Sequence, residues 1–386
     1  MADAPAKRRI RIGFVLTELL GGGAERSMLG IIDALDRARF DPVLVVFVRR
    51  EDHAPPADAP VIVLAGGGIT APGRLTARVR DLAGIIARER LDLVVSFLIG
   101  ANVVATLAAK RAGVPVVIGE RSAPLAVLSP ANAALKMQWL WRMLVRRLYP
   151  QATAVVTNTR GAGRELVEQF RVPADRIAVI PNAVDLERIR ALAAAPLDDA
   201  ARWPAGPVLV HVGRFSHAKD HDTLLRAFAI VRAGRPATLV LVGDGEDEAR
   251  VRALTADLGL DGSVVFTGFT RNPYAYLARA TLCVLTSRFE GLPNALLEAM
   301  ALGIPIVSTA CQYGPIELLD GTGDGVLTPV GDPQAFASAV VALLDDEPRR
   351  RELSRRGTAR AADFDRRRLA ARYEALFLTA SRASGT

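Results

Sequence analysis

The feature of this sequence that most constrains its fold is a repeated alternation of short apolar runs with longer helical stretches. The runs are RIGFVLT, PVLVVFV, VIVLA, LDLVVSF, PVVIGE and ATAVVTN in the first half, and PVLVHVG, ATLVLVG, SVVFTG, TLCVLTS, IPIVST and GVLTP in the second. Strands that are apolar along their whole length are typical of parallel sheets with helices on both faces. The two series therefore predict two doubly wound α/β domains of the Rossmann type.

The chain length also favours two domains, because 386 residues exceed what one hydrophobic core usually holds. A proline-containing stretch that is polar at both ends separates the two series of strands. We therefore expect a first domain at 1–182, a linker at 183–206 and a second domain at 207–364. The apolar residues of 365–386 recur at helical spacing, which predicts a last helix that packs back across the domain junction.

The composition indicates which partners and sites to expect. A formal net charge of +8 favours anionic partners, namely phosphates, nucleic acid or an acidic membrane surface. Two cysteines and four histidines are too few for a disulfide framework or a metal cluster, so we expect no metal, no cofactor and a reducing, cytoplasmic location. No basic-aromatic module for reading nucleic acid is present, which argues against that partner.

The uncharged segment 93–109 just reaches the length of a membrane span, about 17 residues. It contains Ser96, Gly100 and Asn102, and it starts as a buried-strand pattern. We therefore expect a strand, a break near the glycine and then a helix.

Two glutamates follow one of the predicted strands, in the stretch SRFEGLPNALLEAMALGIPIVST. Glu290 comes directly after the strand, where α/β folds bind ligands. Glu298 lies inside a helix that starts at Pro293 or Asn294 and ends at Gly303, among apolar neighbours. A carboxylate in that setting needs a partner, and the hydroxyl groups of a ligand would serve. The alternative is that Glu290 is a solvated loop charge and that Glu298 pairs with a local arginine.

Two cations, Arg214 and Lys219, lie upstream in HVGRFSHAKDHDTLLRAF, on one loop after another predicted strand. Together they could clamp a diphosphate, the arginine by its planar fork and the lysine as a point charge. The alternative is ordinary surface charge.

Together these stretches resemble the retaining family-4 glycosyltransferases of GT-B architecture, in which two Rossmann-like domains face a central cleft. The likeness covers nearly the whole chain. It rests on GGGAERSMLGIIDAL, GRFSHAKDHDTLLRAF, LVGDGEDEARVRALTADLGLDGSVVFTGF and the Glu-x7-Glu stretch.

The resemblance implies a role for each matching position. Arg214 and Lys219 would hold the nucleotide diphosphate, Glu290 the hydroxyls of the donor sugar and Glu298 the ribose. Backbone or side-chain contacts to the donor are implied for Gly22, Gly23, Gly268, Phe269, Thr270, Gly291, Leu292 and Asn294. The implied chemistry is metal-independent transfer with retained stereochemistry, in which the departing diphosphate is stabilised electrostatically.

Glu120 stands in PVVIGERSAP, at about the place where many members of the family have histidine. This departure resembles the branch that extends lipid-linked glycans or builds exopolysaccharide. Two interpretations stay open for Glu120. It either contacts or deprotonates the acceptor hydroxyl as a catalytic group, or it forms a structural pair with Arg121 or another cation. In the first interpretation Arg121 binds the acceptor.

The segment 132–150 predicts a helix that mixes aromatic and basic residues. Such a helix could lie peripherally on an anionic bilayer and reach lipid diphosphates through Arg142 and Arg146, which are neighbours on one face. The alternative is an ordinary packed helix with solvated arginines.

The sequence thus predicts an enzyme that moves a hexose or N-acetylhexosamine from a nucleoside diphosphate donor, expected to be UDP-linked, to a lipid-linked or growing glycan. A nucleotide-sugar 2-epimerase of the same fold is an alternative, and a non-catalytic protein that binds glycans or membranes is another. A NAD-dependent dehydrogenase is disfavoured because GGGAER and GDGEDE both lack the G-x-G-x-x-G pattern.

Overall fold

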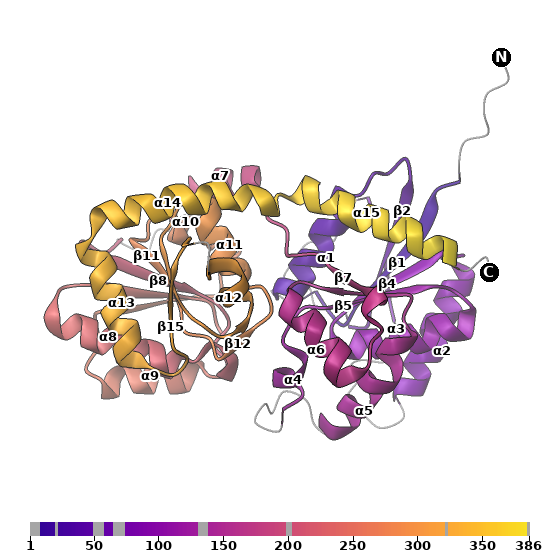
Figure 1. The fold of residues 1–386 in the computed structure, drawn as a ribbon, viewed down its shortest axis with the longest axis horizontal. Helices are drawn as coiled ribbons and strands as arrows, with labels where there is room; N and C mark the ends of the chain where they lie inside the picture. The colour runs from indigo at the N-terminus through magenta and orange to yellow at the C-terminus, as the bar shows by residue number, and fades with distance from the viewer. Residues whose placement is uncertain are drawn as a thin grey trace, which may run out of the picture. The chain divides into compact units, whose positions relative to one another are not determined.

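The computed structural model describes residues 8–19, 22–48, 58–64, 74–129, 138–197, 203–320 and 323–383 (Figure 1). The chain divides into two compact units. Unit 1 comprises Met1–Ala183 and Arg366–Thr386, and unit 2 comprises Val184–Asp365.

Unit 1 is built on a parallel sheet of seven strands within the described residues, in the order β3-β2-β1-β4-β5-β6-β7. The strands are β1 (Ile10–Leu16), β2 (Phe40–Val46), β3 (Val61–Val63), β4 (Leu93–Phe97), β5 (Val116–Glu120), β6 (Ala154–Thr157) and β7 (Ile177–Val179). The central strands β4, β5 and β6 are buried at every residue, as the apolar runs predict.

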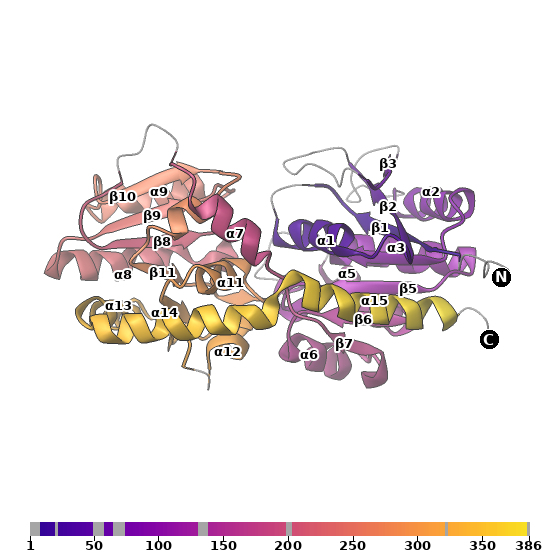
Figure 2. The ribbon, with the colours of Figure 1, turned by 90° about the horizontal axis from the view of Figure 1, so that it is seen from above.

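Helices cover both faces of this sheet, as Figures 1 and 2 show. They are α1 (Gly23–Ala34), α2 (Arg74–Arg88), α3 (Ile99–Ala112), α4 (Pro124–Val127), α5 (Gln138–Leu148), α6 (Arg160–Phe170) and α15 (Arg366–Arg382). Helices α2, α3, α5 and α6 contribute to the core on one face. On the other face α1 packs against α15, and the ring of Phe377 meets those of Phe14 and Phe40 edge-on.

Unit 2 contains a six-stranded parallel sheet among the described residues, in the order β10-β9-β8-β11-β13-β15, and a separate two-stranded pair, β12-β14. The strands are β8 (Val208–Val212), β9 (Thr238–Val242), β10 (Val264–Gly268), β11 (Leu282–Leu285), β12 (Phe289–Glu290), β13 (Ile306–Thr309), β14 (Gln312–Tyr313) and β15 (Val326–Thr328). The order reverses between β8 and β11, which makes that position the topological switch point of the sheet.

The helices of unit 2 also lie on both sides of its sheet (Figure 1). They are α7 (Leu186–Ala193), α8 (His221–Gly234), α9 (Glu248–Asp257), α10 (Tyr274–Leu277), α11 (Asn294–Ala301), α12 (Gly314–Leu319), α13 (Pro333–Asp345) and α14 (Glu347–Ala361). Helices α8, α9 and α13 close the core on one face. Helix α11 packs against α7 and α14.

The twelve apolar runs all form strands, and the segment 93–109 forms β4 and most of α3, as expected. Sequence reasoning missed β7, which has three partly buried residues, and the pair β12 and β14, which have two residues each. The structure also differs at 183–206. This stretch was expected to be a linker, but α7 packs into unit 2 and buries Ile189 and Ala193.

Candidate active site

The loops that follow β8 and β11 carry two of the predicted site residues. Lys219 ends a short 3-10 turn, His217–Lys219, in the loop after β8, and Glu290 lies in β12, just after β11. These two strands are neighbours at the switch point, where doubly wound sheets bind ligands beyond the carboxyl ends of their strands. The topology therefore explains why residues 71 positions apart in sequence come together.

Lys219 and Glu290 form a partly buried ion pair. The ammonium Nζ lies 2.5 Å from Glu290 Oε1, and the two side chains are 18% and 14% exposed. Ser287 Oγ donates a second hydrogen bond to the same oxygen at 2.7 Å. Sequence reasoning did not name Ser287, although a hydroxyl three residues before a predicted site glutamate was the available signal. The pair presents a cation and a carboxylate side by side at the edge of the sheet.

The backbone at Glu290 is held by a close contact with a second segment. Strand β12 pairs in parallel with β14, with Glu290 opposite Tyr313. The next residue, Gly314, touches the turn after Glu290. A Cβ at that position would lie 1.9 Å from Gly291 O and 2.7 Å from Leu292 Cα. Only glycine therefore permits this approach, which fixes the turn that leads into α11.

Helix α11 starts at Asn294, as predicted, and places Glu298 inside unit 2. Glu298 is 4% exposed. The pKa of the Cys283 thiol in β11 rises to about 12, chiefly because the thiol is buried and secondly because of the charge of Glu298. The structure thus places Glu298 towards β11.

Arg214 does not join Lys219 and Glu290 within the described part of the chain. Its Nε donates to Glu246 Oε2 at 2.9 Å, and the side chain is 69% exposed. Glu246 follows β9, so this pair also lies at the carboxyl edge of the sheet. Lys219 is therefore partly buried at the switch point, whereas Arg214 of the same loop is exposed and pairs with Glu246, and a clamp formed by the two cations stays a prediction.

The other predicted donor contacts lie in several loops. In unit 2, Gly268 ends β10 with φ +70° and accepts a hydrogen bond from Gly243 N at 3.0 Å. Phe269 is 44% exposed, and Thr270 Oγ1 accepts a hydrogen bond from the backbone of Asn272. In unit 1, Gly22 precedes α1 and Gly23 is its first residue. The rest of that glycine-rich motif, Gly21, lies outside the described residues.

A buried histidine pair lies under the Lys219 loop. The rings of His211, in β8, and His221, the first residue of α8, are 4.9 Å apart and fully buried. His211 Nδ1 donates to the carbonyl of Val284 at 3.0 Å. Burial, reinforced by the charge of Lys219, lowers the pKa of His221 to about 3. Burial also lowers the pKa of His211 well below its ordinary value, so both rings are neutral.

In unit 1, Glu120 ends β5 and belongs to a buried hydrogen-bond chain. Ser122 Oγ donates to its Oε1 at 2.8 Å, and Tyr149 OH donates to Oε2 at 3.1 Å. Tyr149 OH accepts in turn from Asn102 Nδ2 at 3.0 Å. Glu120 is 1% exposed, and burial raises its pKa. These hydrogen bonds hold Glu120 inside unit 1, and its catalytic role stays a prediction.

Arg121 is held by acceptors other than the Glu120 carboxylate. Its guanidinium does not pair with the Glu120 carboxylate, but donates to Ser27 Oγ at 2.7 Å, to Tyr373 OH at 3.1 Å and to Asn182 Oδ1. The side chain is 8% exposed and stacks on a phenylalanine ring. Its Nε has no hydrogen-bond partner among the described residues, and the role of Arg121 in acceptor binding stays a prediction. The side chain ties α1 and α15 together within unit 1.

Helix α5 carries the predicted Arg142 and Arg146 on an exposed face. Two apolar side chains accompany them, because Trp139 is 63% exposed and Met143 is 60% exposed. The first part of the predicted helix, 132–137, lies outside the described residues. In the described ranges, no helix has the length and apolar character needed to cross a bilayer.

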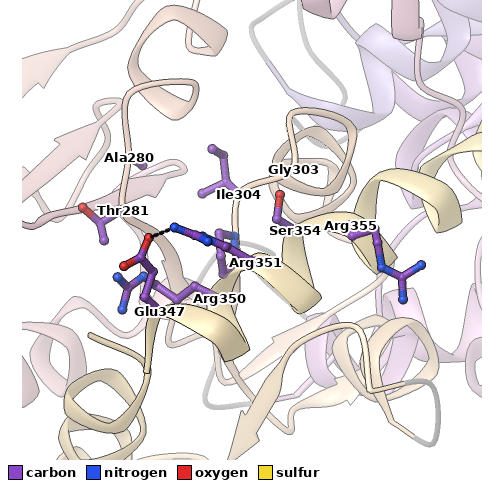
Figure 3. A pocket seen from close by; sticks show the side chains of 10 residues that line it. Ala280, Thr281, Gly303, Ile304, Glu347, Arg350, Arg351, Ser354 and Arg355 are labelled. Atoms are coloured by element: carbon purple, nitrogen blue, oxygen red, sulfur yellow. Dashed lines mark hydrogen bonds and ion pairs between the residues drawn. The ribbon is translucent and has the colours of Figure 1, made fainter. Parts of the chain in front are cut away.

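A pocket of about 430 Å³ lies at the opposite edge of the unit 2 sheet (Figure 3). Thr281 and Pro305 line it from the positions just before β11 and β13. Its arginines already bind protein groups. Arg350 donates to two backbone carbonyls, and Arg351 pairs with Glu347. Across the described residues, no three His, Cys, Asp or Glu side chains are grouped so that they could hold a metal ion.

Both units match known families of glycosyltransferases. Residues 21–188 match the family "Glycosyltransferase Family 4", and residues 206–346 match "Glycosyl transferases group 1". Among curated proteins, an N-acetylgalactosaminyltransferase of Campylobacter jejuni, whose name includes a diphospho-undecaprenol-linked sugar, is 31% identical over 229 residues. The match covers 59% of this chain and 61% of that relative, so the chain spans less than two thirds of its length.

Solved structures share the fold at low identity. Sucrose-phosphate synthase of Thermosynechococcus elongatus matches with a TM-score of 0.82 at 20% identity, over 96% of this chain and 99% of that one. HepE of Anabaena, solved in complex with UDP and glucose, matches with a TM-score of 0.76 at 22% identity, over 96% and 99% of the two chains.

Proposed function

Because the chain belongs to the family-4 glycosyltransferases of the GT-B fold, we propose that it transfers a hexose or N-acetylhexosamine from a UDP-linked donor to a lipid-linked or growing glycan. The observation that carries this proposal is the Lys219–Glu290 ion pair at the switch point of unit 2. The Anabaena neighbour was solved with UDP and glucose, and the Campylobacter relative is named for a lipid-diphosphate substrate. Both names agree with a donor and an acceptor of these classes.

Lys219 is the group that meets the donor diphosphate in this proposal. Its ammonium is a compact point charge on a flexible stem, so it can turn from Glu290 to a phosphate oxygen. Negative charge grows on the diphosphate as the bond to the sugar breaks, and a preplaced cation stabilises that charge. Arg214, which is exposed and close in sequence, adds a second cation once its contact with Glu246 opens. The reaction then proceeds with retained stereochemistry and without a metal.

Glu290 and Glu298 hold hydroxyl groups of the donor. Glu290 Oε1 already accepts from Lys219 and Ser287, and its second oxygen can accept from a sugar hydroxyl. Glu298 is buried on α11 and offers a carboxylate suited to the paired hydroxyls of a ribose. The turn at Gly291 and Leu292 and the start of α11 at Asn294 supply backbone groups to the same ligand.

The donor half of the proposal is tested by incubating the protein with UDP-sugars, with and without a lipid-diphosphate glycan, and following UDP release and the glycan product. We expect Lys219→Ala and Glu290→Gln to lower kcat/KM by about 10²- to 10³-fold, the usual loss when one stabilising group is removed. Glu352→Gln, at an exposed glutamate paired with Arg355, is the matched control and should act like wild type. Wild-type rates in both site variants would refute the assignment, and a C2 epimer formed from donor alone would favour an epimerase.

The acceptor half of the proposal places α5 on an anionic bilayer. Trp139 and Met143 are one turn apart, so both can enter the interface, while Arg142 and Arg146 meet lipid phosphates. Each such arginine contributes about 1 kcal/mol near an anionic surface. A peripheral contact of this kind would bring the protein to a membrane-embedded acceptor.

This contact is tested by flotation with vesicles that contain phosphatidylglycerol, compared with vesicles of phosphatidylcholine alone. We expect wild type to bind the anionic vesicles, and we expect the double variant Trp139→Ser, Met143→Ser to bind them about tenfold less tightly. Ile230→Ser, at an exposed apolar residue of α8, is the control. Equal binding by the double variant and wild type would contradict the proposal.

A further inference from the structure

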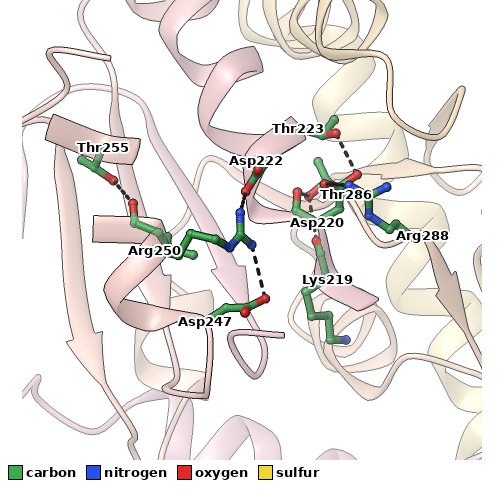
Figure 4. A network of polar contacts seen from close by, with 10 residues as sticks. Lys219, Asp220, Asp222, Thr223, Asp247, Arg250, Thr255, Thr286 and Arg288 are labelled. Atoms are coloured by element: carbon green, nitrogen blue, oxygen red, sulfur yellow. Dashed lines mark hydrogen bonds and ion pairs between the residues drawn. The ribbon is translucent and has the colours of Figure 1, made fainter. Parts of the chain in front are cut away.

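Two charged residues that sequence reasoning did not select, Asp220 and Arg288, join two segments of unit 2 (Figure 4). Asp220 follows Lys219 in its loop, and Arg288 lies in the segment that carries Glu290. Arg288 NH2 lies 2.7 Å from Asp220 Oδ1. The second carboxylate oxygen, Oδ2, accepts from Thr223 Oγ1 at 2.8 Å. Asp220 thus binds at once to the segment after β11 and to the first turn of α8.

Asp220 is an unusual position for a carboxylate. Its side chain is 1% exposed, whereas that of Arg288 is 43% exposed. Its backbone has φ +48° and ψ 55°, which is the left-handed region between the Lys219 turn and α8. Glycine or asparagine would satisfy that backbone conformation. Unlike glycine or asparagine, the aspartate therefore provides a buried negative charge, and this charge binds Arg288.

Backbone contacts join the same two segments. Arg288 N donates to the carbonyl of Ala218 at 2.8 Å. Thr286 Oγ1 lies 3.1 Å from both Lys219 O and Asp220 O and donates to them. The carbonyl of Lys219 is therefore fixed by the segment that leads to Glu290. The Asp220–Arg288 ion pair closes the other side of this connection.

We propose that Asp220 and Arg288 are positioning residues that hold Lys219 in register with the donor diphosphate, an inference that rests on the proposed function. A lysine has a long stem, so the place of its ammonium depends on how firmly its backbone is held. A shift of about 1 Å in a group that binds the reacting centre can cost about 100-fold in rate. The pair acts only through Lys219 and touches no substrate itself.

The experiment measures the Kd of UDP and of uridine by titration calorimetry, because only UDP carries the diphosphate that Lys219 binds. We expect Asp220→Asn and Arg288→Ala to weaken UDP binding about tenfold and to leave uridine binding unchanged. Arg288→Lys, which restores the charge, should recover most of the affinity. Asp345→Asn breaks the exposed ion pair with Arg235 at the far end of α8 and should leave both affinities unchanged.

A double-mutant cycle tests whether the pair acts through Lys219. In a Lys219→Ala background, adding Asp220→Asn should weaken UDP binding by less than about twofold, because the group being positioned is already gone. A full tenfold loss in that background would overturn the inference, as would unchanged UDP binding in both single variants. Uridine binding that falls as much as UDP binding would also overturn it.

Failure of the proposed function gives a different result from failure of this inference. If wild type binds neither UDP nor uridine, the proposed function fails. If wild type binds UDP and the variants bind it equally well, only the positioning role fails. Should Asp220→Asn not fold, Arg288→Ala and Arg288→Lys carry the test, because Arg288 is partly exposed.

Discussion

Lowering the pH from about 7.5 to about 5.5 should destabilise unit 2 through its buried histidine pair. Burial lowers the pKa of His221 from 6.5 to about 3, and it lowers the pKa of His211 in the same direction. Within the described residues, neither nitrogen of His221 has a hydrogen-bond partner, so a charge there would be buried and unpaired. As the pH falls through 6.5, the histidines of the unfolded chain become protonated while those of the folded unit stay neutral, and the free energy of unfolding decreases.

The magnitude follows from linkage. For one group with an unfolded pKa of 6.5 and a folded pKa of about 3, the free energy of unfolding falls by about 1.4 kcal/mol between the two pH values. If His211 also stays neutral over this range, the pair contributes about 2.7 kcal/mol. This contribution is fully present above pH 6.5 and is lost progressively towards pH 3.

Urea unfolding at the two pH values measures this difference. Trp203 is the only tryptophan of the sequence in unit 2, so replacing Trp139 and Trp141 by phenylalanine makes fluorescence report that unit. The variant His221→Leu should reduce the difference by about 1.4 kcal/mol, while the control His217→Leu, at an exposed position, keeps the wild-type value. An unchanged pH difference in His221→Leu would refute the reasoning, since only the buried ring was removed.

Two further predictions concern packing. Gly314→Ala should lower the free energy of unfolding in urea by about 1–3 kcal/mol and lower the transfer rate, because its Cβ would overlap Gly291 O. The control is Gly84→Ala, which has no atom within 4 Å of the added Cβ and should be neutral or stabilising. Equal effects of the two substitutions would contradict the argument. Phe377→Ala should cost about 3–5 kcal/mol in unit 1, because the ring is fully buried against Phe14, and a loss below about 1 kcal/mol would show that α15 is not part of that core.

Much of the fold could be predicted because its strands are buried on both faces. A strand such as β5 must then be apolar throughout, and that pattern is visible without any partner. Strands β12 and β14 could not be predicted in this way, because a two-residue strand has no periodicity and is defined only by its pairing with another strand. The stretch 183–206 was misjudged for a similar reason. Its helix α7 is short, and only the contacts of that helix place the stretch in unit 2.

The positions of the candidate site residues were predictable where they lie in the segments that follow strands. Lys219 and Glu290 each occupy such a position, and the structure brings them together. Asp220 was not predictable, because its partner Arg288 is 68 residues away and its burial depends on both segments. The contacts of Arg121 were not predictable either, because its partner Tyr373 lies 252 residues further along the chain. Sequence spacing indicates which residues follow strands, but it does not show which charges are already bound by protein.

Helix α15 gives unit 1 a particular dependence on the order of synthesis. Phe377 completes the layer over Phe14 and Phe40, yet the ribosome makes it only after all of unit 2. The first 183 residues therefore emerge with part of one side of their sheet still uncovered, while unit 2 is contiguous and can fold as soon as it leaves the exit tunnel. A nascent chain stalled before residue 366 should expose that apolar surface to chaperones, and release of the last helix would close it.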